Sequence, residues 1–219
     1  FLTGHPLEGV NNDLKRVTDI EIDKLATLVD GQPVRVGGLI QTFREHKSKK
    51  GDRMAFATLE DMTGSVELVV FPNAFAECGH LLGREEPVVV LGRVQLEERG
   101  PKITVESIEP LHAALIKYTQ DVIIRIRAQQ TSRQHLEQLK EMLYQHHGTC
   151  PVRLTLHFDG RGEVDVEILK DLKIRPSSEF FRQVEETLGY SSLIIRMKEA
   201  ELPPSRNKGF GNYNKNTVH

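Results

Sequence analysis

The stretch MAFATLEDMTGSVELVVF, residues 54–71, decides the fold class of this chain. It contains two short runs, 54–60 and 65–71, that are rich in apolar and β-branched residues. Asp61 and Gly64 lie between them and favour a turn. Short β-branched runs bounded by such residues are typical of β-strands, so this stretch predicts two strands that follow each other closely along the chain.

Three further runs of the same kind flank this stretch. They cover 34–40, 87–95 and 102–108, and Gly37 and Gly38 inside the first are expected to let a strand bend. Between the third and fourth runs, residues 72–82 start with Pro72 and carry apolar residues at helical spacing, which predicts one short helix. Three strands, a helix and two strands form the order of an OB fold, a five-stranded Greek-key barrel, which we expect over residues 31–112.

The sequences on either side of the predicted barrel read differently. Residues 1–30 place Leu14, Val17 and Ile22 among charges and predict a helical lead-in, with Asp13 and Thr18 as possible helix caps. Residues 120–200 predict a second, small α+β domain. Pro110 breaks the pattern, and we expect an open connection at 112–120.

The second domain is predicted from its periodicity and its turn residues. Strands are expected at 122–126, 152–158, 164–168, 172–174 and 192–196. A helix starts after Ser132 and another after Ser177 or Ser178, the latter ending at Gly189. This order resembles split βαβ units. Residues 203–219 are polar and rich in Gly and Asn, so a disordered tail is expected there.

Composition limits the function. The 219 residues carry a net charge of −2, so any binding of nucleic acid requires a local basic cluster rather than a basic surface. Cys78 and Cys150 lie far apart without metal-binding spacing, which argues against disulfides and zinc and favours a reducing cytoplasm. No membrane span or secretory signal is found. Because the chain begins at Phe1, we expect a piece of a longer polypeptide.

A basic cluster does occur, between the first two predicted strands. Residues 44–53 hold five basic and two acidic residues, and in an OB barrel this connection and the one between strands four and five flank the groove for single-stranded nucleic acid. The alternative is a solvated surface loop. The candidate residues are Arg44, Lys47, Lys49, Lys50 and Arg53 in the first connection, and Arg99 and Lys102 in or beside the second.

Aromatic rings could supply stacking platforms for bases on the same barrel. Phe43, Phe56 and Phe71 are the candidates, although a core position is the alternative for each. Alternation puts Phe56 on the face opposite Ala55 and Ala57, but the sequence does not show which face is interior.

Catalytic signals are nearly missing from the sequence. Glu163, Asp165 and Glu167 alternate with apolar residues and are interpreted as the solvent-facing side of a strand rather than as ligands for two metals. His146 and His147 end a helix, where imidazoles favour the dipole. No phosphate loop or nucleophile motif is found, so we predict no catalytic residues, no metal and no cofactor in this chain.

Several motifs resemble those of one family, the alpha subunits of bacterial DNA polymerase III. They are the opening FLTGHPL, VGGLI at 36–40, ATLEDMTGSVE at 57–67 and VVFP at 69–72. The first is fairly specific to that family, whereas the pattern around 57–71 also occurs in other OB domains, including those of class II aminoacyl-tRNA synthetases. The resemblance covers about residues 1–200 and implies the C-terminal region of that subunit.

The resemblance also implies roles. In that family the catalytic sites precede this region, the OB domain lies near the single-stranded DNA template, and the last domain binds the tau subunit of the clamp loader. A non-catalytic fragment of a nucleotidyltransferase is therefore expected, with the rest of the polymerase as a further partner. Residues 120–200 hold 12 basic and 12 acidic residues, which fits a protein partner better than a polyanion. Two alternatives stay open: a free-standing single-strand-binding protein and an anticodon-binding module of a class II synthetase.

Overall fold

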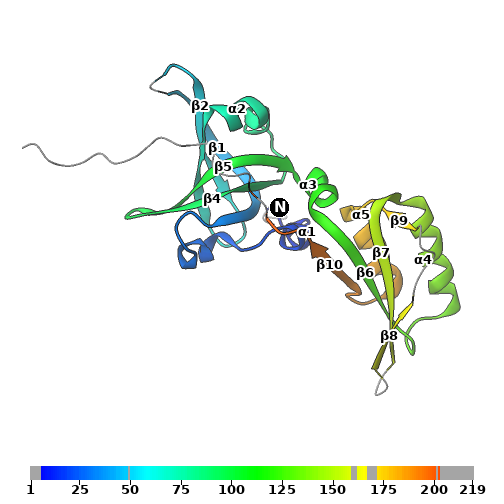
Figure 1. Ribbon diagram of the computed structural model, residues 1–219. Helices are drawn as coiled ribbons and strands as arrows, with labels where there is room; N and C mark the ends of the chain where they lie inside the picture. The colour runs from blue at the N-terminus through cyan, green and yellow to red at the C-terminus, as the bar shows by residue number, and fades with distance from the viewer. Residues whose placement is uncertain (1–5, 49, 159–161, 167–171, 201, 203–219) are drawn as a thin grey trace, which may run out of the picture.

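The first half of the chain forms a closed five-stranded barrel in the order β1-β2-β3-β5-β4 (Figure 1). The computed structural model describes residues 6–48, 50–158, 162–166, 172–200 and 202, with the backbone alone for 162–166. The strands are β1 (Pro33–Lys47), β2 (Arg53–Glu60), β3 (Ser65–Val70), β4 (Val88–Glu97) and β5 (Gly100–Pro110). Helix α2 (Pro72–Cys78) and the 3₁₀ turn η2 (Gly79–Leu81) follow β3, so the predicted OB order is confirmed.

Glycines allow the strands to approach closely enough to close the barrel. A Cβ atom on Gly38 would lie 2.2 Å from the carbonyl oxygen of Glu60, and one on Gly92 would lie 2.4 Å from that of Thr104. Gly92 lies at the register shift between β4 and β5, and Gly38 lies two residues before the shift between β1 and β2. Since L side chains would clash with backbone here, glycine is required for the bend.

The barrel interior settles which face of β2 is buried. Ala55, Ala57 and Leu59 lie in the barrel core, so the alternating residues Phe56 and Thr58 point outward. The outward orientation of Phe56 is what a stacking platform needs.

The lead-in divides into helix α1 (Asn11–Val17) and the 3₁₀ helix η1 (Ile22–Thr27). Of the two predicted caps, Asp13 is wrong, because it lies inside α1 and pairs with Arg16. Thr18 is a cap at the C-terminal end of the helix, where its hydroxyl donates to the carbonyl of Leu14. The start of η1 is stabilised by a residue of the β2–β3 turn: Asp61 accepts a hydrogen bond from the backbone N–H of Ile22.

The second domain is a sheet in the order β10-β6-β7-β8, with β9 paired to β7. Its strands are β6 (Thr119–Arg127), β7 (His147–Phe158), β8 (Gly162–Val166), β9 (Lys173–Ile174) and β10 (Leu193–Met197), and its helices are α4 (Arg133–Gln145) and α5 (Ser178–Leu188). Ser132 and Ser177 cap the helices as expected, and Gly189 ends α5 at φ 74°. The α+β class is confirmed, but β6 and β7 are adjacent and parallel, so the βαβ unit is not split.

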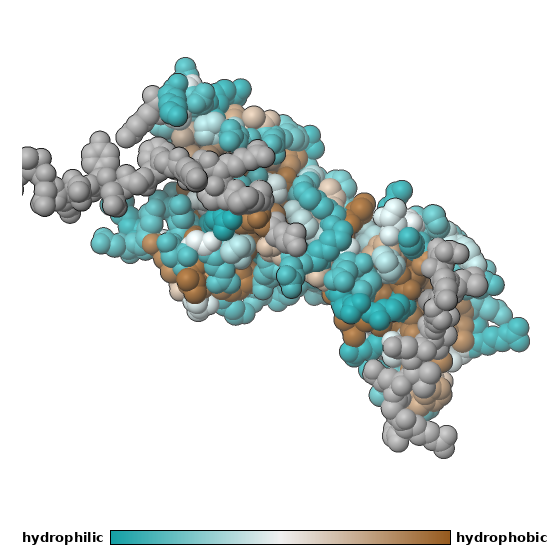
Figure 2. Space-filling model, viewed as in Figure 1, coloured by the Kyte–Doolittle hydropathy of each residue, from teal (hydrophilic) through white to brown (hydrophobic). Residues whose placement is uncertain are grey.

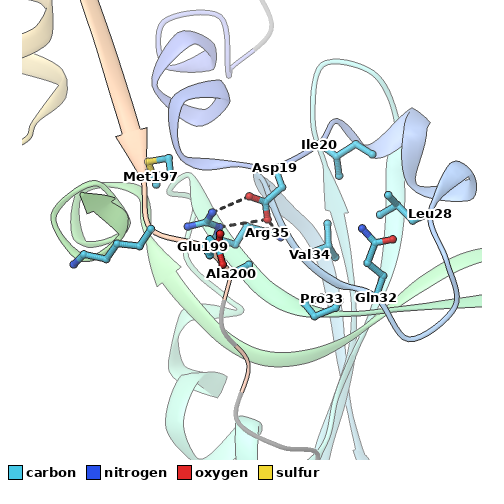
Figure 3. A pocket seen from close by; sticks show the side chains of 11 residues that line it. Asp19, Ile20, Leu28, Gln32, Pro33, Val34, Arg35, Met197, Glu199 and Ala200 are labelled. Atoms are coloured by element: carbon cyan, nitrogen blue, oxygen red, sulfur yellow. Dashed lines mark hydrogen bonds and ion pairs between the residues drawn. The ribbon is translucent and has the colours of Figure 1, made fainter. Parts of the chain in front are cut away.

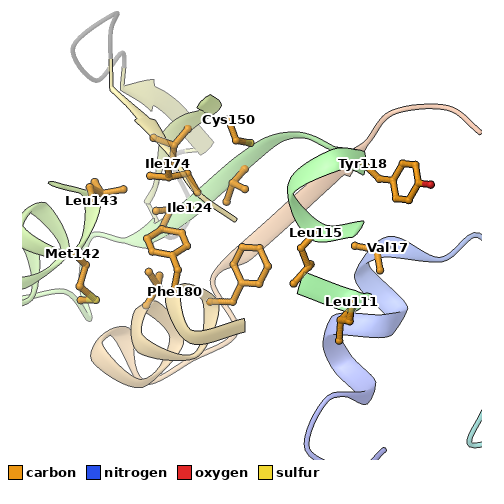
Figure 4. Close-up of a cluster of buried hydrophobic side chains, with 14 of the residues drawn as sticks. Val17, Leu111, Leu115, Tyr118, Ile124, Met142, Leu143, Cys150, Ile174 and Phe180 are labelled. Atoms are coloured by element: carbon orange, nitrogen blue, oxygen red, sulfur yellow. The ribbon is translucent and has the colours of Figure 1, made fainter. Parts of the chain in front are cut away.

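Where the sequence predicts an open connection, that is, an exposed linker between the domains, the structure has a helix, α3 (Leu111–Tyr118). Leu111, Leu115 and Tyr118 of α3 are buried with Val17 of α1 and with Phe180 of α5 in one hydrophobic core (Figure 4). The linker was predicted because Pro110 interrupts the strand pattern. In the structure Pro110 is the last residue of β5, and α3 begins directly after it. The predicted tail, 203–219, lies outside the described residues.

Both cysteines are free and buried, one in each core. Burial raises the pKa of the Cys78 thiol and of the Cys150 thiol to about 11 in each case. Within the described ranges of the chain, no helix is long and apolar enough to cross a membrane.

Candidate nucleic-acid interface

The predicted basic connection is a long hairpin rather than a loop, because β1 runs on as far as Lys47. Its turn is held by Ser48, whose hydroxyl accepts hydrogen bonds from the backbone N–H groups of Lys50 and Asp52. Gly51 has φ 89°, a left-handed conformation that glycine adopts without strain. The tip projects from the barrel in Figure 1, and Figure 2 shows it as strongly hydrophilic.

Strand pairing distributes the hairpin's charges over two faces. Arg44 is the register partner of the outward-facing Phe56, whereas Glu45 is the partner of the inward-facing Ala55. Because directly paired residues share a face, Arg44 and His46 lie on the outer face, and Lys47 and Arg53 lie on the side of α2. The predicted cluster is therefore split, and Lys49 lies outside the described residues.

The side of the hairpin that faces α2 has its arginine neutralised. The Arg53 guanidinium donates to both oxygens of Glu45 at 2.8 and 2.9 Å and lies 5.1 Å from the centre of the Phe75 ring. A hollow of about 750 Å³ lies between Asp52, Arg53, Phe75 and His80. Arg53 is thus held by its own chain, which reduces its contribution to phosphate binding.

The outer face combines one exposed arginine with an aromatic ring. His46 and Phe56 meet edge to face with their ring centres 6.1 Å apart, and Arg44 lies across the strand from Phe56. Arg44 on this face, and Lys47 and Lys50 near the tip, are exposed, and none forms an ion pair with another residue that the structure describes. Such a face offers phosphate contacts next to a stacking platform.

The second connection adds less charge than its sequence suggests. Arg99 is exposed at the turn between β4 and β5. Lys102 is held by Glu67 at 2.9 Å and Glu97 at 3.0 Å, and its hydrogen bonds to these carboxylates raise the pKa of its ammonium group. Lys102 stays protonated, but the carboxylates of Glu67 and Glu97 already compensate its positive charge.

The remaining aromatic candidates are less favourably placed than Phe56. Phe43 is 44% exposed but lies on the α2 side of the hairpin, close to Gly83. Phe71 is half-buried at the N-terminal cap of α2. His46, which sequence reasoning passed over, could have been found from its position two residues from Arg44, since alternate residues of a strand share a face.

A second hollow, of about 440 Å³, lies where the barrel meets the second domain (Figure 3). Arg35 forms its floor: this arginine is 3% exposed, pairs with Asp19 at 2.8 Å and lies 5.2 Å from the ring centre of Tyr118. Arg35 of the barrel forms an ion pair with Asp19 of the lead-in, and its guanidinium stacks on the ring of Tyr118 in α3. It therefore connects the lead-in, the barrel and α3.

The barrel belongs to a known class. Residues 34–111 match the family model of the OB-fold nucleic acid binding domain, and this agrees with the strand order of the barrel. The particular relatives are DNA polymerase III alpha subunits. The chain is 30% identical to the subunit of Pseudomonas fluorescens and 26% identical to that of Pseudomonas aeruginosa, in each case over 200 residues, or 90% of the chain.

These matches confirm the resemblance inferred from the sequence motifs, and they extend through the second domain. The chain spans 17% of the length of these relatives. Among solved structures, asparaginyl-tRNA synthetase from Pyrococcus horikoshii is 20% identical, with 69% of this chain and 42% of that chain covered and a TM-score of 0.34. Such a low score supports no conclusion about function.

Proposed function

We propose that this chain is the C-terminal region of a bacterial replicative DNA polymerase alpha subunit and has no chemistry of its own. Its barrel binds the single-stranded template, and its second domain binds the tau subunit of the clamp loader. The observation that carries the first role is the outer face of the β1–β2 hairpin, where Arg44 lacks an acidic partner among the described residues and adjoins the His46–Phe56 pair.

The similarity to the alpha subunits favours this proposal over its alternatives. An anticodon-binding module accounts for the barrel, which the family model covers at 34–111, but it leaves the second domain unexplained. A free-standing single-strand-binding protein has the same difficulty. The polymerase relatives match over 90% of the chain and so account for both domains together.

Salt dependence of binding to oligo-dT tests the first role. Replacing Arg44, Lys47 and Lys50 together with alanine should weaken binding. It should also lower the slope of log affinity against log salt by roughly 2, since each lost phosphate contact on a single strand contributes about 0.7. Arg53→Ala should change the slope less, because Arg53 is paired with Glu45.

A matched control keeps the charge change and moves it off the barrel. Arg133, Lys140 and Arg182 are exposed on α4 and α5, and their joint replacement with alanine should leave oligo-dT binding unchanged. Equal slopes for the hairpin variant and the wild type would exclude the hairpin as the phosphate-binding element.

The second role is tested by capture of purified tau subunit on the immobilised chain. Capture that survives removal of the hairpin charges would support a site on the second domain. Nucleotide incorporation by the purified chain on a primed template with magnesium would contradict the proposed lack of catalysis.

A further inference from the structure

No helix in the part of the chain that the structure describes lies over one face of the second sheet. Helices α4 and α5 pack on the other face, where Val122 and Ile124 of β6 are buried in the core together with residues of α1 and α3. The alternating residues of β6 therefore point the opposite way: Ile123 is half-buried, and Arg125 and Arg127 are exposed. We call this side, formed by β10, β6 and β7, the open face.

An aliphatic pair lies at the centre of the open face. Ile123 of β6 is the register partner of Ile194 on β10 and of Arg153 on β7. Both isoleucines are half-buried, and neither belongs to the two hydrophobic cores, whereas Leu193 and Ile195 on the opposite side of β10 pack against the second core. The core of the domain thus gives no reason for these two apolar side chains.

Arginines surround the pair. Arg125, Arg127, Arg153 and Arg196 are all exposed on this face, against one acidic side chain, Asp121, among the described side chains of β6, β7 and β10. Arg196 donates to Asp121 at 2.8 Å and Arg153 does so at 3.4 Å, so these two arginines share one carboxylate. Among the described side chains of these three strands, four arginines therefore face one carboxylate around an apolar centre.

The far edge of the sheet limits this basic region. On β8, Asp165 is the register partner of Thr155 and Glu163 that of His157. The excess of arginine therefore lies over β10, β6 and β7, a strip that an extended segment could follow.

We infer that the open face docks an acidic protein segment that also carries apolar side chains. Carboxylates complement the arginine forks, and apolar residues cover the isoleucine pair. Single-stranded nucleic acid fits less well, because the centre is aliphatic and the nearby Tyr190 ring is already covered by Arg127 at 4.7 Å. The inference rests on the proposed role of the second domain in protein docking. It adds the surface at which the partner binds and the chemistry by which that surface recognises it.

Fluorescence anisotropy with the full chain tests the inference. The probe is a labelled peptide of alternating leucine and aspartate, compared with peptides in which serine replaces leucine or asparagine replaces aspartate. We expect the first peptide to bind and either replacement to weaken it. Arg125→Glu should weaken it about tenfold, and Ile194→Ser should weaken it by a similar factor. Arg182→Glu on the helical face should have no effect, and unchanged melting temperatures would show that the variants are folded.

The inference is overturned if the leucine-aspartate peptide does not bind, or if the wild type and Arg125→Glu bind it equally. If Arg125→Glu weakened the binding of oligo-dT and not that of the peptide, the inference would also be overturned, and the face would be assigned to nucleic acid. The proposed function fails separately. Capture of tau by the wild type and by Arg125→Glu alike supports that proposal and overturns this inference, whereas peptide binding without tau capture does the reverse.

Discussion

The barrel and the second domain build their cores in different ways. The barrel core consists of residues from its own strands, from α2 and η2, and from η1, which adjoins it in sequence. The second core takes Leu7, Leu14 and Val17 from the start of the chain and α3 from the connection, and it reaches Val89 on the outer wall of the barrel. The second domain therefore depends on segments more than 100 residues away along the sequence.

The lead-in is divided between these two cores. Leu14 and Val17 of α1 are buried in the second core, while Ile22 and Leu25 of η1 are buried in the barrel core. The short segment between them, which contains Asp19, joins the domains through Arg35. A boundary drawn from sequence at residue 120 would thus remove part of the second domain's core.

The largest expected loss of stability comes from truncating one buried side chain in each core. Phe181→Ala should destabilise the second domain by about 3–5 kcal/mol, and Leu68→Ala should destabilise the barrel by about 2–5 kcal/mol, since both side chains are fully buried. Pulsed thiol labelling followed by mass spectrometry separates the cores. Phe181→Ala should speed labelling of Cys150, and Leu68→Ala should speed labelling of Cys78.

Equal acceleration of both cysteines in either variant would show that the two cores unfold as one unit. That result would erase the distinction between a self-contained barrel and a dependent second domain. The wild type provides the baseline, because buried thiols with a pKa of about 11 react slowly at neutral pH.

The lead-in itself offers a sharper comparison. Leu14→Ala and Leu25→Ala each remove a buried leucine, and each should cost about 2–4 kcal/mol. Although the two positions are 11 residues apart, Leu14→Ala should expose Cys150 and Leu25→Ala should expose Cys78. Hydrogen exchange at the amides of β6 and β2 would check the assignment. Exposure of Cys78 by Leu14→Ala would place α1 with the barrel instead.

The barrel was predictable because its signals are local. Five β-branched runs, the turn at Asp61 and Pro72 at the start of α2 each depend on neighbours in sequence, and all fall where the structure has them. Helix α3 was missed because its short apolar pattern makes sense only against α1, and no local rule brings these two segments together. The same reason explains the adjacency of β6 and β7, which strand patterns do not encode.

The candidate interface was predictable in composition and not in charge balance. The hairpin was correctly placed between the first two strands, but the pairing of Lys102 with Glu67 depends on β3 lying beside β5, a parallel contact made when the barrel closes. Arg53 and Glu45 are on one face because β1 continues to Lys47. Phosphate-binding roles for all these residues remain predictions.

An intermediate effect is expected from the acidic residue of the second sheet. Burial alone would raise the pKa of Asp121, but hydrogen bonds and charge from Arg196 and Arg153 outweigh it and lower the pKa. A lowered pKa stabilises the fold above the unfolded value, near pH 4, and this contribution is lost as pH falls through the folded value.

Asp121→Asn should therefore cost about 1.5 kcal/mol at pH 7, measured by urea denaturation followed by circular dichroism. The difference from the wild type should shrink as pH falls below about 4. A difference that stays constant down to pH 2 would mean that the carboxylate charge contributes nothing.

The smallest effect concerns the polar link between α1 and the second domain. Arg16 donates to Glu185 of α5 at 2.9 Å, and its guanidinium lies 5.0 Å from the centre of the Phe181 ring. Both charged side chains are about a fifth to a quarter exposed, so solvent screens the pair only partly. A double-mutant cycle with Arg16→Ala and Glu185→Ala should give a coupling energy of about 0.5–1 kcal/mol.

The matched cycle uses Arg182 and Glu186 on the same helix, a pair more than half exposed that links nothing outside α5. Its coupling should be about 0.3–0.5 kcal/mol, typical of exposed pairs four residues apart in a helix. The location of the effect distinguishes the pairs further. Arg16→Ala should increase hydrogen exchange in α1, because it releases that helix from α5, whereas Arg182→Ala should leave α1 unchanged. If both cycles gave the same coupling and α1 stayed protected in Arg16→Ala, the attachment of α1 to the second domain would rest on its apolar side chains alone.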